Sequence, residues 1–408
     1  MSITVLENRV VVLGVTGSIA CYKSADLASK LTQAGAHVET ILTESATRFV
    51  TPLTFRSVTG RAAYTDMWSL DDHVRHVQLG EQADLFVVAP ATAQTIGKLA
   101  AGLADNLLTV SLLAARCPVV VAPAMDGAMY EHPATQGNVA ALRERGVTIV
   151  GPLEGRMASG LVGRGRMAEP WELLGHVRRI LGQDGPLAGR RVVVTAGPTR
   201  ERLDPVRFLS NRSSGKQGVA LAQAAVDAGA SAKLVLGPVE AQVPVGVEVV
   251  RVESAREMAA AVLAAVEEAD VLLMAAAVSD FRPAEAAAQK VKKVEADARV
   301  GIDLARNPDI LIGVKAWKER SGAELVTVGF AAETENALAY GRRKLAEKGL
   351  DLIVVNDVSQ RDAGFQVDNN RVTLVSRQGD ETELPLLSKA EVAERIIQHV
   401  ATFLDSGV

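Results

Sequence analysis

Residues 191–218 read RVVVTAGPTRERLDPVRFLSNRSSGKQG, an apolar strand that runs into a long loop of small and basic residues. The Gly197-Pro198 pair predicts a turn after the strand, and a helix is expected from about Gln217. Small residues let backbone N–H groups approach an anion at a helix N-terminus, where the macrodipole also favours negative charge. The same loop carries three candidate anion partners, Arg200, Arg202 and Arg207. We therefore interpret it as a phosphate or carboxylate site. A surface loop ending in a serine N-cap is the alternative.

Length and composition support a soluble enzyme of two or three ordinary α/β domains without identifying it. The chain has 408 residues, of which 48% are apolar and 4% aromatic. A formal net charge of -4 favours neither a nucleic-acid groove nor a membrane surface. The N-terminus lacks the pattern of a signal peptide. Cys21 and Cys117 are far apart in sequence and form no CxxC pair. This pattern is typical of a protein in the reducing cytoplasm that has no structural zinc site.

Short β-branched runs alternate with alanine- and leucine-rich helical stretches along the whole chain. This alternation is typical of parallel sheets covered by helices on both faces. The best linker follows a helix expected over Trp171–Leu181 and reads GQDGPLAG over residues 182–189, so we place the domain boundary there. A hairpin around Gly379-Asp380 and a last helix from Ser388 are expected near the end. Strands are expected to begin near Val10, Val38, Leu85, Val119, Val147, Val192, Ala232, Val247, Val271, Leu325 and Leu352.

An ordered series of motifs identifies a family resemblance over essentially the whole chain. The first half contains GVTGSIACYK, APAT, GLADNLL, PAMDGAMY and GRGRM, and the second AAAVSDFRP, KVKK, NPDI, VGFAAET and NDVSQ. Together with the 195–218 loop, they resemble the bifunctional phosphopantothenoylcysteine decarboxylase/phosphopantothenate-cysteine ligase of coenzyme A biosynthesis. The resemblance implies a flavodoxin-like, doubly wound, FMN-binding decarboxylase domain over 1–184. It also implies a Rossmann-like, CTP-dependent ligase domain over 187–408, and a homo-oligomer.

The flavin site is expected at the glycine turn that follows the first strand. Gly17 follows the carboxyl end of the strand Val10–Val15, which is where open α/β sheets commonly bind a phosphate. The spacing of the glycines in this turn is not that of a dinucleotide-binding GxGxxG motif. The threonines, serine and asparagine named below could equally cap helices or turns. The resemblance implies FMN contacts from Gly17, Ser18, Thr43, Ser45, Pro90, Ala91, Thr92 and Asn106.

Three further residues are implied in decarboxylation. His76 matches the family's active-site histidine and is expected to orient the substrate or move a proton. Asp126 stands where the family commonly has asparagine, and Ser159 where it has a cysteine acid in the flap. A serine is a far weaker acid than a thiol, and a carboxylate repels the substrate's carboxylate. We expect an active variant that uses Ser159 or water; both residues as simple turn caps is the alternative.

The resemblance implies that the second half binds CTP and magnesium and forms an acyl-cytidylate that the cysteine amine attacks. In this scheme Asn211 holds the acyl intermediate, Arg207 the substrate phosphate or carboxylate, and Lys290 the departing phosphates. The structural alternatives are an N-cap for Asp280, a helix opener for Asn307-Pro308 and a core role for Phe330. CTP contacts are implied for Met274, Ala275, Ala276, Asp280, Lys290, Asn307, Pro308, Asp309, Ile310, Phe330, Lys344 and Lys348, with Asp280 also on Mg²⁺.

Two other functions compete with this interpretation. The flavin domain could have lost decarboxylation while the ligase remains active. The chain could also be a flavin-binding regulatory or scaffold subunit, although the intact ligase motifs argue against that class.

Overall fold

The computed structural model describes residues 4–68, 74–157, 160–291, 301–333, 336–357 and 368–405. The chain divides into two compact units at Gly182/Gln183, within the stretch that the sequence indicates as a linker. Within the described ranges, no helix is long and apolar enough to cross a membrane.

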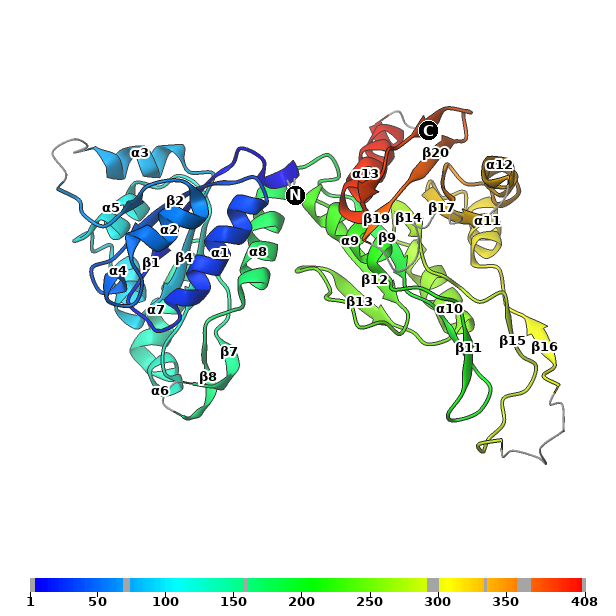
Figure 1. Cartoon of the computed structure of the whole chain (residues 1–408), viewed down its shortest axis with the longest axis horizontal. Coiled ribbons are helices and arrows are strands. Elements are labelled where there is room, and N and C mark those ends of the chain that lie inside the picture. The colour runs from blue at the N-terminus through cyan, green and yellow to red at the C-terminus, as the bar shows by residue number, and fades with distance from the viewer. Residues whose placement is uncertain are drawn as a thin grey trace. The chain divides into compact units, whose positions relative to one another are not determined.

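The N-terminal unit is built on a parallel sheet of order β3-β2-β1-β4-β5-β6 (Figure 1). Its valine-rich strands are buried on both faces, as expected for a parallel sheet covered by helices. Without the two-residue β3, the order is that of flavodoxin-like sheets, which confirms the predicted fold class. The strands are β1 (Val10–Val15), β2 (His37–Leu42), β3 (Ala63–Tyr64), β4 (Leu85–Ala91), β5 (Val119–Pro123) and β6 (Thr148–Ile149).

Helices cover both faces of this sheet and share its strand residues alternately. Val11 and Leu13 of β1 face one core, while Val12 faces the other. The first core takes α1 (Cys21–Gln33), α2 (Pro52–Thr59) and α8 (Pro170–Gly182); the second takes α3 (Arg75–Gln82), α4 (Ala93–Ala101), α5 (Leu107–Ala114) and α7 (Pro133–Glu144). Short α6 (Gly127–Glu131) packs against the hairpin of β7 (Leu153–Arg156) and β8 (Val162–Arg166).

The C-terminal unit has a sheet of order β13-β12-β9-β14-β17-β18-β20-β21. Its first six members are parallel and follow the order of dinucleotide-binding folds, which confirms the Rossmann-like prediction. The last two run antiparallel and form the expected hairpin. The strands are β9 (Arg191–Ala196), β12 (Ser231–Leu236), β13 (Glu248–Arg251), β14 (Val271–Met274), β17 (Val326–Glu333), β18 (Leu352–Asp357), β20 (Val372–Ser376) and β21 (Glu381–Glu383).

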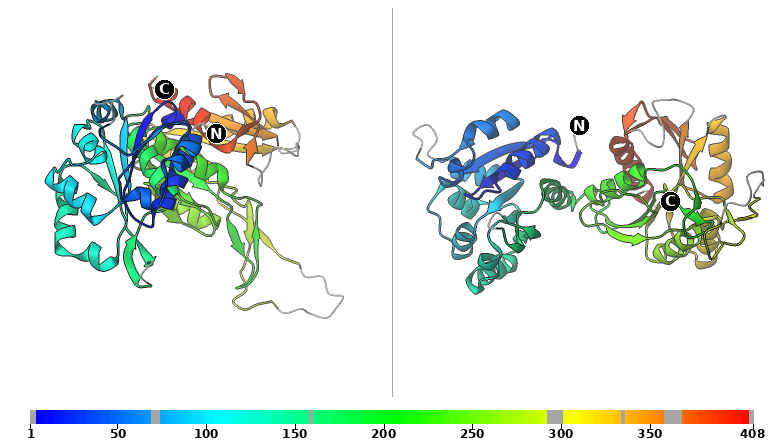
Figure 2. Two further views of the ribbon diagram at one scale, coloured as in Figure 1. Left: turned by 60° about the vertical axis from the view of Figure 1, so that its left-hand side comes forward. Right: turned by 60° about the horizontal axis from the view of Figure 1, so that its bottom comes forward.

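Among the described residues of this unit, two helices pack on one face of the sheet and three on the other. The first face takes α9 (Lys216–Asp227) and α13 (Lys389–Asp405), and the second takes α10 (Ala255–Val266), α11 (Ile310–Ser321) and α12 (Ala337–Lys348). Two antiparallel ribbons project together from the sheet (Figure 2). They are β10 (Arg200–Arg202) with β11 (Phe208–Ser210), and β15 (Phe281–Pro283) with β16 (Leu304–Arg306). A minor pair, β19 (Asn369–Asn370) and β22 (Leu387–Ser388), lies near the start of α13.

Candidate functional site

The loops after β1 and β4 meet at the point where the strand order of the N-terminal sheet reverses. Thr16 joins them: its hydroxyl donates to the Pro90 carbonyl over 2.7 Å and accepts the Thr92 N–H over 3.0 Å. Such a switch point leaves a crevice at the carboxyl ends of the strands, where open α/β sheets bind ligands. The predicted residues Gly17, Ser18, Pro90, Ala91 and Thr92 are thereby brought together at this edge.

The loop after β2 closes directly against the glycine turn. A Cβ added to Gly17 would lie 2.4 Å from the Cβ of Ser45, so only glycine fits there. Thr43 accepts the Ala46 N–H at 3.3 Å with its hydroxyl and thereby caps the next turn of chain. Ser45 is thus adjacent to the proposed phosphate turn, whereas the described contacts of Thr43 hold the turn after β2, through the Ala46 N–H, and join it to the Val15 carbonyl at 3.0 Å.

An open pocket of about 570 Å³ lies at this edge. Of the predicted residues, Gly17, Ser18, Thr92 and Asp126 line it. Its apolar wall includes Phe49, Ala124, Met125, Met129, Met157 and Met167, and its cations are Lys23, Arg156 and Arg166. A pocket with an apolar wall and a few converging charges is typical of a cofactor site.

Lys23 is a residue of this pocket that the sequence interpretation missed. It is only 7% exposed, and its Nζ donates to the Met167 carbonyl at 3.0 Å and to Glu169 Oε1 at 2.7 Å. A signal was present in the sequence, because Lys23, Leu27 and Leu31 share one stripe of α1 and both leucines are buried. A lysine on the apolar stripe of a helix indicates a charge with a specific partner.

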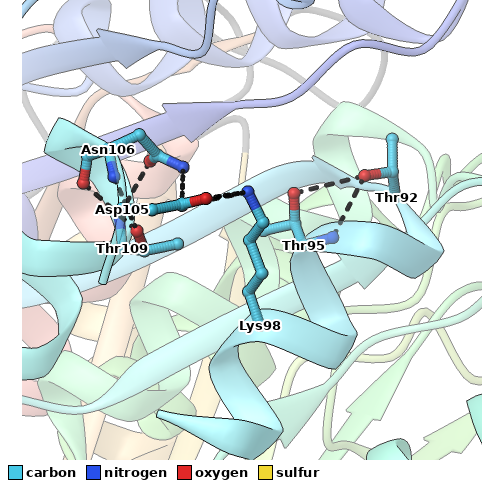
Figure 3. Close-up of polar contacts among 6 residues, drawn as sticks. All are labelled: Thr92, Thr95, Lys98, Asp105, Asn106 and Thr109. Carbon is cyan, nitrogen blue, oxygen red and sulfur yellow. Dashed lines mark hydrogen bonds and ion pairs between the residues drawn. The ribbon is translucent and has the colours of Figure 1, made fainter. Parts of the chain in front are cut away.

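Thr92 and Asn106 both serve as helix caps (Figure 3). Thr92 accepts the Thr95 N–H at 3.3 Å, and Asn106 forms a reciprocal capping box with Thr109. The Asn106 amide also donates to Asp105, whose pKa the ion pair with Lys98 holds below its usual value. Asn106 is not among the described residues that line the pocket, so its flavin contact stays a prediction.

Asp126 and the β7–β8 hairpin form one wall of the pocket. Asp126 is the N-cap of α6 and accepts the Ala128 N–H at 3.2 Å. The neighbouring Met125 N–H donates to the Gly165 carbonyl at 3.1 Å, and a Cβ on Gly165 would lie 2.2 Å from the Met125 carbonyl oxygen. The hairpin therefore seats on the Asp126 segment through a contact that requires glycine. Ser159 lies outside the described residues.

His76 is half-buried in the first turn of α3. His76 itself is not among the described pocket-lining residues of its own chain.

The second site forms at the switch point between β9 and β14. Pro198 bridges to Ala277, and the Ala277 N–H donates to the Gly197 carbonyl at 2.9 Å. The predicted loops TAGPT and AAAVSD therefore lie side by side at the carboxyl edge of the sheet, although the two motifs are far apart in sequence. Thr199 adds a further link, because its hydroxyl accepts the Ser279 N–H at 3.0 Å.

Asn211 and the start of α9 complete this edge. The Asn211 amide donates to the Val278 carbonyl at 2.9 Å, so the signature loop is held on the strand-end segment that carries Asp280. Gly215 precedes α9 with a φ of +72°, a left-handed conformation that favours glycine. Lys216 pairs with Asp368 at 2.6 Å.

Several predicted nucleotide residues have structural partners. Asn307 donates its amide to the Ser279 carbonyl and its N–H to the Asp280 carbonyl, both at 2.8 Å. Asp309 caps α11 and pairs with Lys348 at 2.8 Å. Burial raises the pKa of Asp309, but the Lys348 hydrogen bond and the cap outweigh burial and leave this pKa below its usual value.

The remaining nucleotide residues divide between the core and the edge. Lys344 donates to the Phe330 carbonyl at 2.6 Å. Met274 and Ile310 are buried, Ala275, Ala276 and Phe330 are half-buried, and Pro308, Asp280 and Lys290 are exposed. The described residues contain no cluster of three His, Cys, Asp or Glu side chains that could hold a metal ion by themselves.

Arg207 is tied to a carboxylate that the sequence interpretation did not single out. Its Nε and Nη2 donate to Asp204 Oδ2 at 2.9 and 2.6 Å, and the Asp204 side chain is fully buried. The Arg207 side chain remains about half exposed, at 51%. The arginine-rich loop therefore contains its own counter-ion.

Two family models together match nearly the whole chain. The Flavoprotein model matches residues 3–182, and the model of the DNA/pantothenate metabolism flavoprotein C-terminal domain matches residues 187–404. The chain is 46% identical over 401 residues to the coenzyme A biosynthesis bifunctional protein CoaBC of Bacillus subtilis (strain 168), covering 97% of each. It is 47% identical over 407 residues to the protein of that name from Mycobacterium tuberculosis (strain H37Rv), covering 97% of this chain and 96% of that one.

Solved structures are similar to each unit separately. The C-terminal domain of a coenzyme A biosynthesis bifunctional protein CoaBC is 39% identical, with a TM-score of 0.46, over 54% of this chain and 99% of that one. A PPC decarboxylase mutant complexed with pantothenoylaminoethenethiol is 37% identical, with a TM-score of 0.40, over 42% of this chain and 97% of that one.

Proposed function

The chain belongs to the family of bifunctional coenzyme A biosynthesis proteins CoaBC, and on that premise we propose that it joins 4'-phosphopantothenate to cysteine and decarboxylates the product to 4'-phosphopantetheine. The observation that carries the proposal is the identity of 46–47% with relatives that span both units. Residues 1–184 would decarboxylate with FMN, and residues 187–408 would ligate with CTP and Mg²⁺.

A single coupled assay tests the whole proposal. The purified protein is supplied with 4'-phosphopantothenate, cysteine, CTP and Mg²⁺, and pyrophosphate and carbon dioxide are followed separately. We expect both products, and ATP in place of CTP should release much less pyrophosphate. Pyrophosphate without carbon dioxide would mean that the first unit has lost decarboxylation, and release of neither would contradict the proposal.

The chemistry of the N-terminal pocket supports FMN as its ligand. Small residues at Gly17 and Ser18 suit a phosphate, and Ser45 stands close enough to contribute a hydroxyl. The methionine-rich wall suits a planar ring, with Thr92 beside it. Pro90 and Ala91 are buried and are not among the described lining residues, so their flavin contacts remain part of the proposal. Flavin, when bound, supplies the two-electron chemistry of decarboxylation. A flavin absorption band in the purified protein is the direct check.

Within this pocket the chain's own residues would handle protons and charge. We assign His76 to orienting the substrate or moving a proton, and Ser159, or a water it holds, to the final protonation. Ser159→Cys should speed the last reductive step, because a thiol gives up its proton more readily than an alcohol. His76→Asn should suppress carbon dioxide release itself, and normal release would remove His76 from the mechanism.

The ligase site would bind CTP along the carboxyl ends of β9 and β14. Met274–Ala276 would approach the nucleotide with backbone, while Asn307–Ile310, Phe330, Lys344 and Lys348 would border it. Lys290 would neutralise the triphosphate, and Asp280 would supply one carboxylate to Mg²⁺, which commonly binds through one or two carboxylates plus phosphate oxygens.

Asn211 and Arg207 would act on the substrate. The Asn211 amide, which donates to the Val278 carbonyl, would turn to the acyl-cytidylate, and Arg207 would use its exposed edge for the substrate phosphate or carboxylate. Asn211→Asp should impair formation or use of the acyl intermediate, because it places a carboxylate where an amide donates. Unchanged pyrophosphate release and amide yield would remove Asn211 from this role.

We also propose that the protein is a homo-oligomer. Exposed apolar side chains gather on the two projecting ribbons, namely Val206, Phe208, Phe281, Ile302 and Leu304. In the first unit, Ile19, Tyr22 and Phe49 at the pocket are 63%, 65% and 50% exposed. A second copy packed against either surface would cover these side chains. Sedimentation of Tyr22→Ser and Phe208→Ser variants should show smaller species, and a monomeric parent would contradict the proposal.

A further inference from the structure

The turn between β10 and β11 is organised around one buried carboxylate. Asp204 accepts the N–H groups of Val206 and Arg207 with Oδ1, both at 2.8 Å. Its other oxygen, Oδ2, accepts the Arg207 guanidinium and the Val291 N–H, the latter at 3.2 Å. One oxygen therefore builds the turn, and the other reaches a segment 87 positions away.

That distant segment carries the loop lysine. Val291 directly follows Lys290, and both backbone polar groups of Val291 are held, because Arg207 Nη2 also donates to the Val291 carbonyl at 2.8 Å. A further link joins the Ala287 N–H to the Leu203 carbonyl at 2.9 Å. The chain on both sides of Lys290 is thus fastened to the turn through backbone groups, without use of the lysine side chain.

The strength of this link comes from charge and burial. Hydrogen bonds to an ionised acceptor are roughly twice as strong as neutral ones. The Arg207 guanidinium holds the pKa of Asp204 well below its usual range, so the acceptor stays ionised. Val291 is 40% exposed, and without the carboxylate its N–H could bond to water instead.

We propose that Asp204 is a positioning residue of the ligation reaction, which fixes Val291 and thereby directs Lys290 toward the nucleotide phosphates. This inference rests on the proposed role of Lys290. It also gives Arg207 a second task, because the same guanidinium closes the link on the Val291 carbonyl.

The Asp204→Asn variant separates the two oxygens. An asparagine can keep its carbonyl oxygen on the Val206 and Arg207 N–H groups, so the turn persists. Its NH₂ then faces the Arg207 guanidinium and the Val291 N–H, where donors meet donors and the link is lost. The matched control is Glu253→Gln, which removes the ion pair with Arg202 on the same hairpin but does not reach Val291.

A double-mutant cycle with Lys290→Gln measures whether the two residues act together. We expect Asp204→Asn to lower kcat for pyrophosphate release at least tenfold with KM for CTP within twofold, because the lysine acts on the transition state. In the Lys290→Gln background, the same change should cost less than twofold. Equal losses in both backgrounds would overturn the proposal, since Asp204 would then act independently of Lys290.

Hydrogen exchange of the unliganded enzyme tests the link without any substrate. The backbone amides of residues 284–291 should exchange at least tenfold faster in Asp204→Asn than in the parent or Glu253→Gln. Unchanged exchange would refute the link. Normal pyrophosphate release by Lys290→Gln would instead refute the proposed role of Lys290 and, with it, a catalytic purpose for Asp204, even if exchange changes.

A second variant covers the case in which Asp204→Asn does not fold. Val291→Pro deletes the N–H that Oδ2 accepts and leaves the turn intact. It should show the same loss of kcat, with carbon dioxide release from supplied phosphopantothenoylcysteine as the check on the rest of the chain. Full ligase turnover by Val291→Pro would overturn the proposal.

Discussion

At the scale of single residues, Asp126 carries a negative charge into a pocket proposed for a carboxylate substrate. Asp126→Asn keeps the N-cap of α6, because the two residues cap helices about equally well. We expect the KM for phosphopantothenoylcysteine to fall about 3- to 10-fold, which corresponds to about 1 kcal/mol of repulsion in a partly solvated site. Glu131→Gln at the other end of α6 is the control. Steady-state carbon dioxide release is the measurement, and an unchanged or higher KM would contradict the prediction.

Loss of the buried cation Lys23 should lower both the stability and the flavin content of the same unit. In Lys23→Met, the Met167 carbonyl loses its donor, and Glu169 keeps its pair with Arg166 at 3.3 Å. We expect the free energy of unfolding to fall by about 1.5–3 kcal/mol, as for other hydrogen bonds to charged groups. Bound flavin should fall as well, because α1 starts at the phosphate turn.

The control for Lys23 lies on the same helix. Lys30 pairs with Asp26 on the surface of α1, and Lys30→Met should cost less than about 1 kcal/mol. Calorimetry and the ratio of flavin to protein absorbance measure both variants. Similar losses from Lys23→Met and Lys30→Met would show that burial of Lys23 is unimportant.

Sequence patterns located these residues better than they defined their roles. Asn106 and Asp309 were predicted as ligands, and each caps a helix. A cap and a ligand contact both need a short polar side chain at a helix start, so one sequence cannot distinguish them. The role of Asp204 could not be predicted from the sequence, because its partner Val291 is distant in the chain and contributes only backbone atoms.

At the scale of elements, the β7–β8 hairpin depends on one glycine and not on its neighbour. A Cβ on Gly165 would lie 2.2 Å from the Met125 carbonyl oxygen, whereas the nearest atom to a Cβ on Gly163 is the Met157 methyl at 3.7 Å. Gly165→Ala should therefore move the hairpin off the Asp126 segment and reduce carbon dioxide release at least tenfold. Gly163→Ala, on the same strand, should retain at least half of the parent rate. Equal rates for the two variants would contradict this account of the pocket wall.

The elements that the sequence predicted are those long enough to show a pattern. Strands such as Val10–Val15 and Arg191–Ala196 are buried runs of β-branched residues, and the predicted start of each lies within one residue of the observed one. The ribbons β10–β11 and β15–β16 were not predicted. Three-residue antiparallel strands such as Phe281–Pro283 have too few side chains to display an alternation, and their pairing depends on distant partners.

At the scale of the whole molecule, the two units place their candidate sites by the same topological rule. In each, the loops after two neighbouring central strands meet, β1 with β4 in one unit and β9 with β14 in the other, and a threonine joins them, Thr16 in one and Thr199 in the other. Sheet order follows from the alternation of strands and helices, so this placement could be predicted. The threonine links could not, because they are long-range contacts between unremarkable residues.

The two units should fold and act as separate fragments, because each has its own hydrophobic core. Each cluster of buried apolar residues draws its members from one side of Gly182/Gln183. Residues 1–182 expressed alone should therefore be folded and yellow with flavin, and residues 183–408 should release pyrophosphate with CTP, phosphopantothenate and cysteine. A mixture of the two fragments should carry out both ligation and decarboxylation, because the ligated product can diffuse from one fragment to the other. Gel filtration, absorbance and the coupled assay measure this, and a colourless or insoluble 1–182 fragment would mean that the flavin site needs residues beyond its own core.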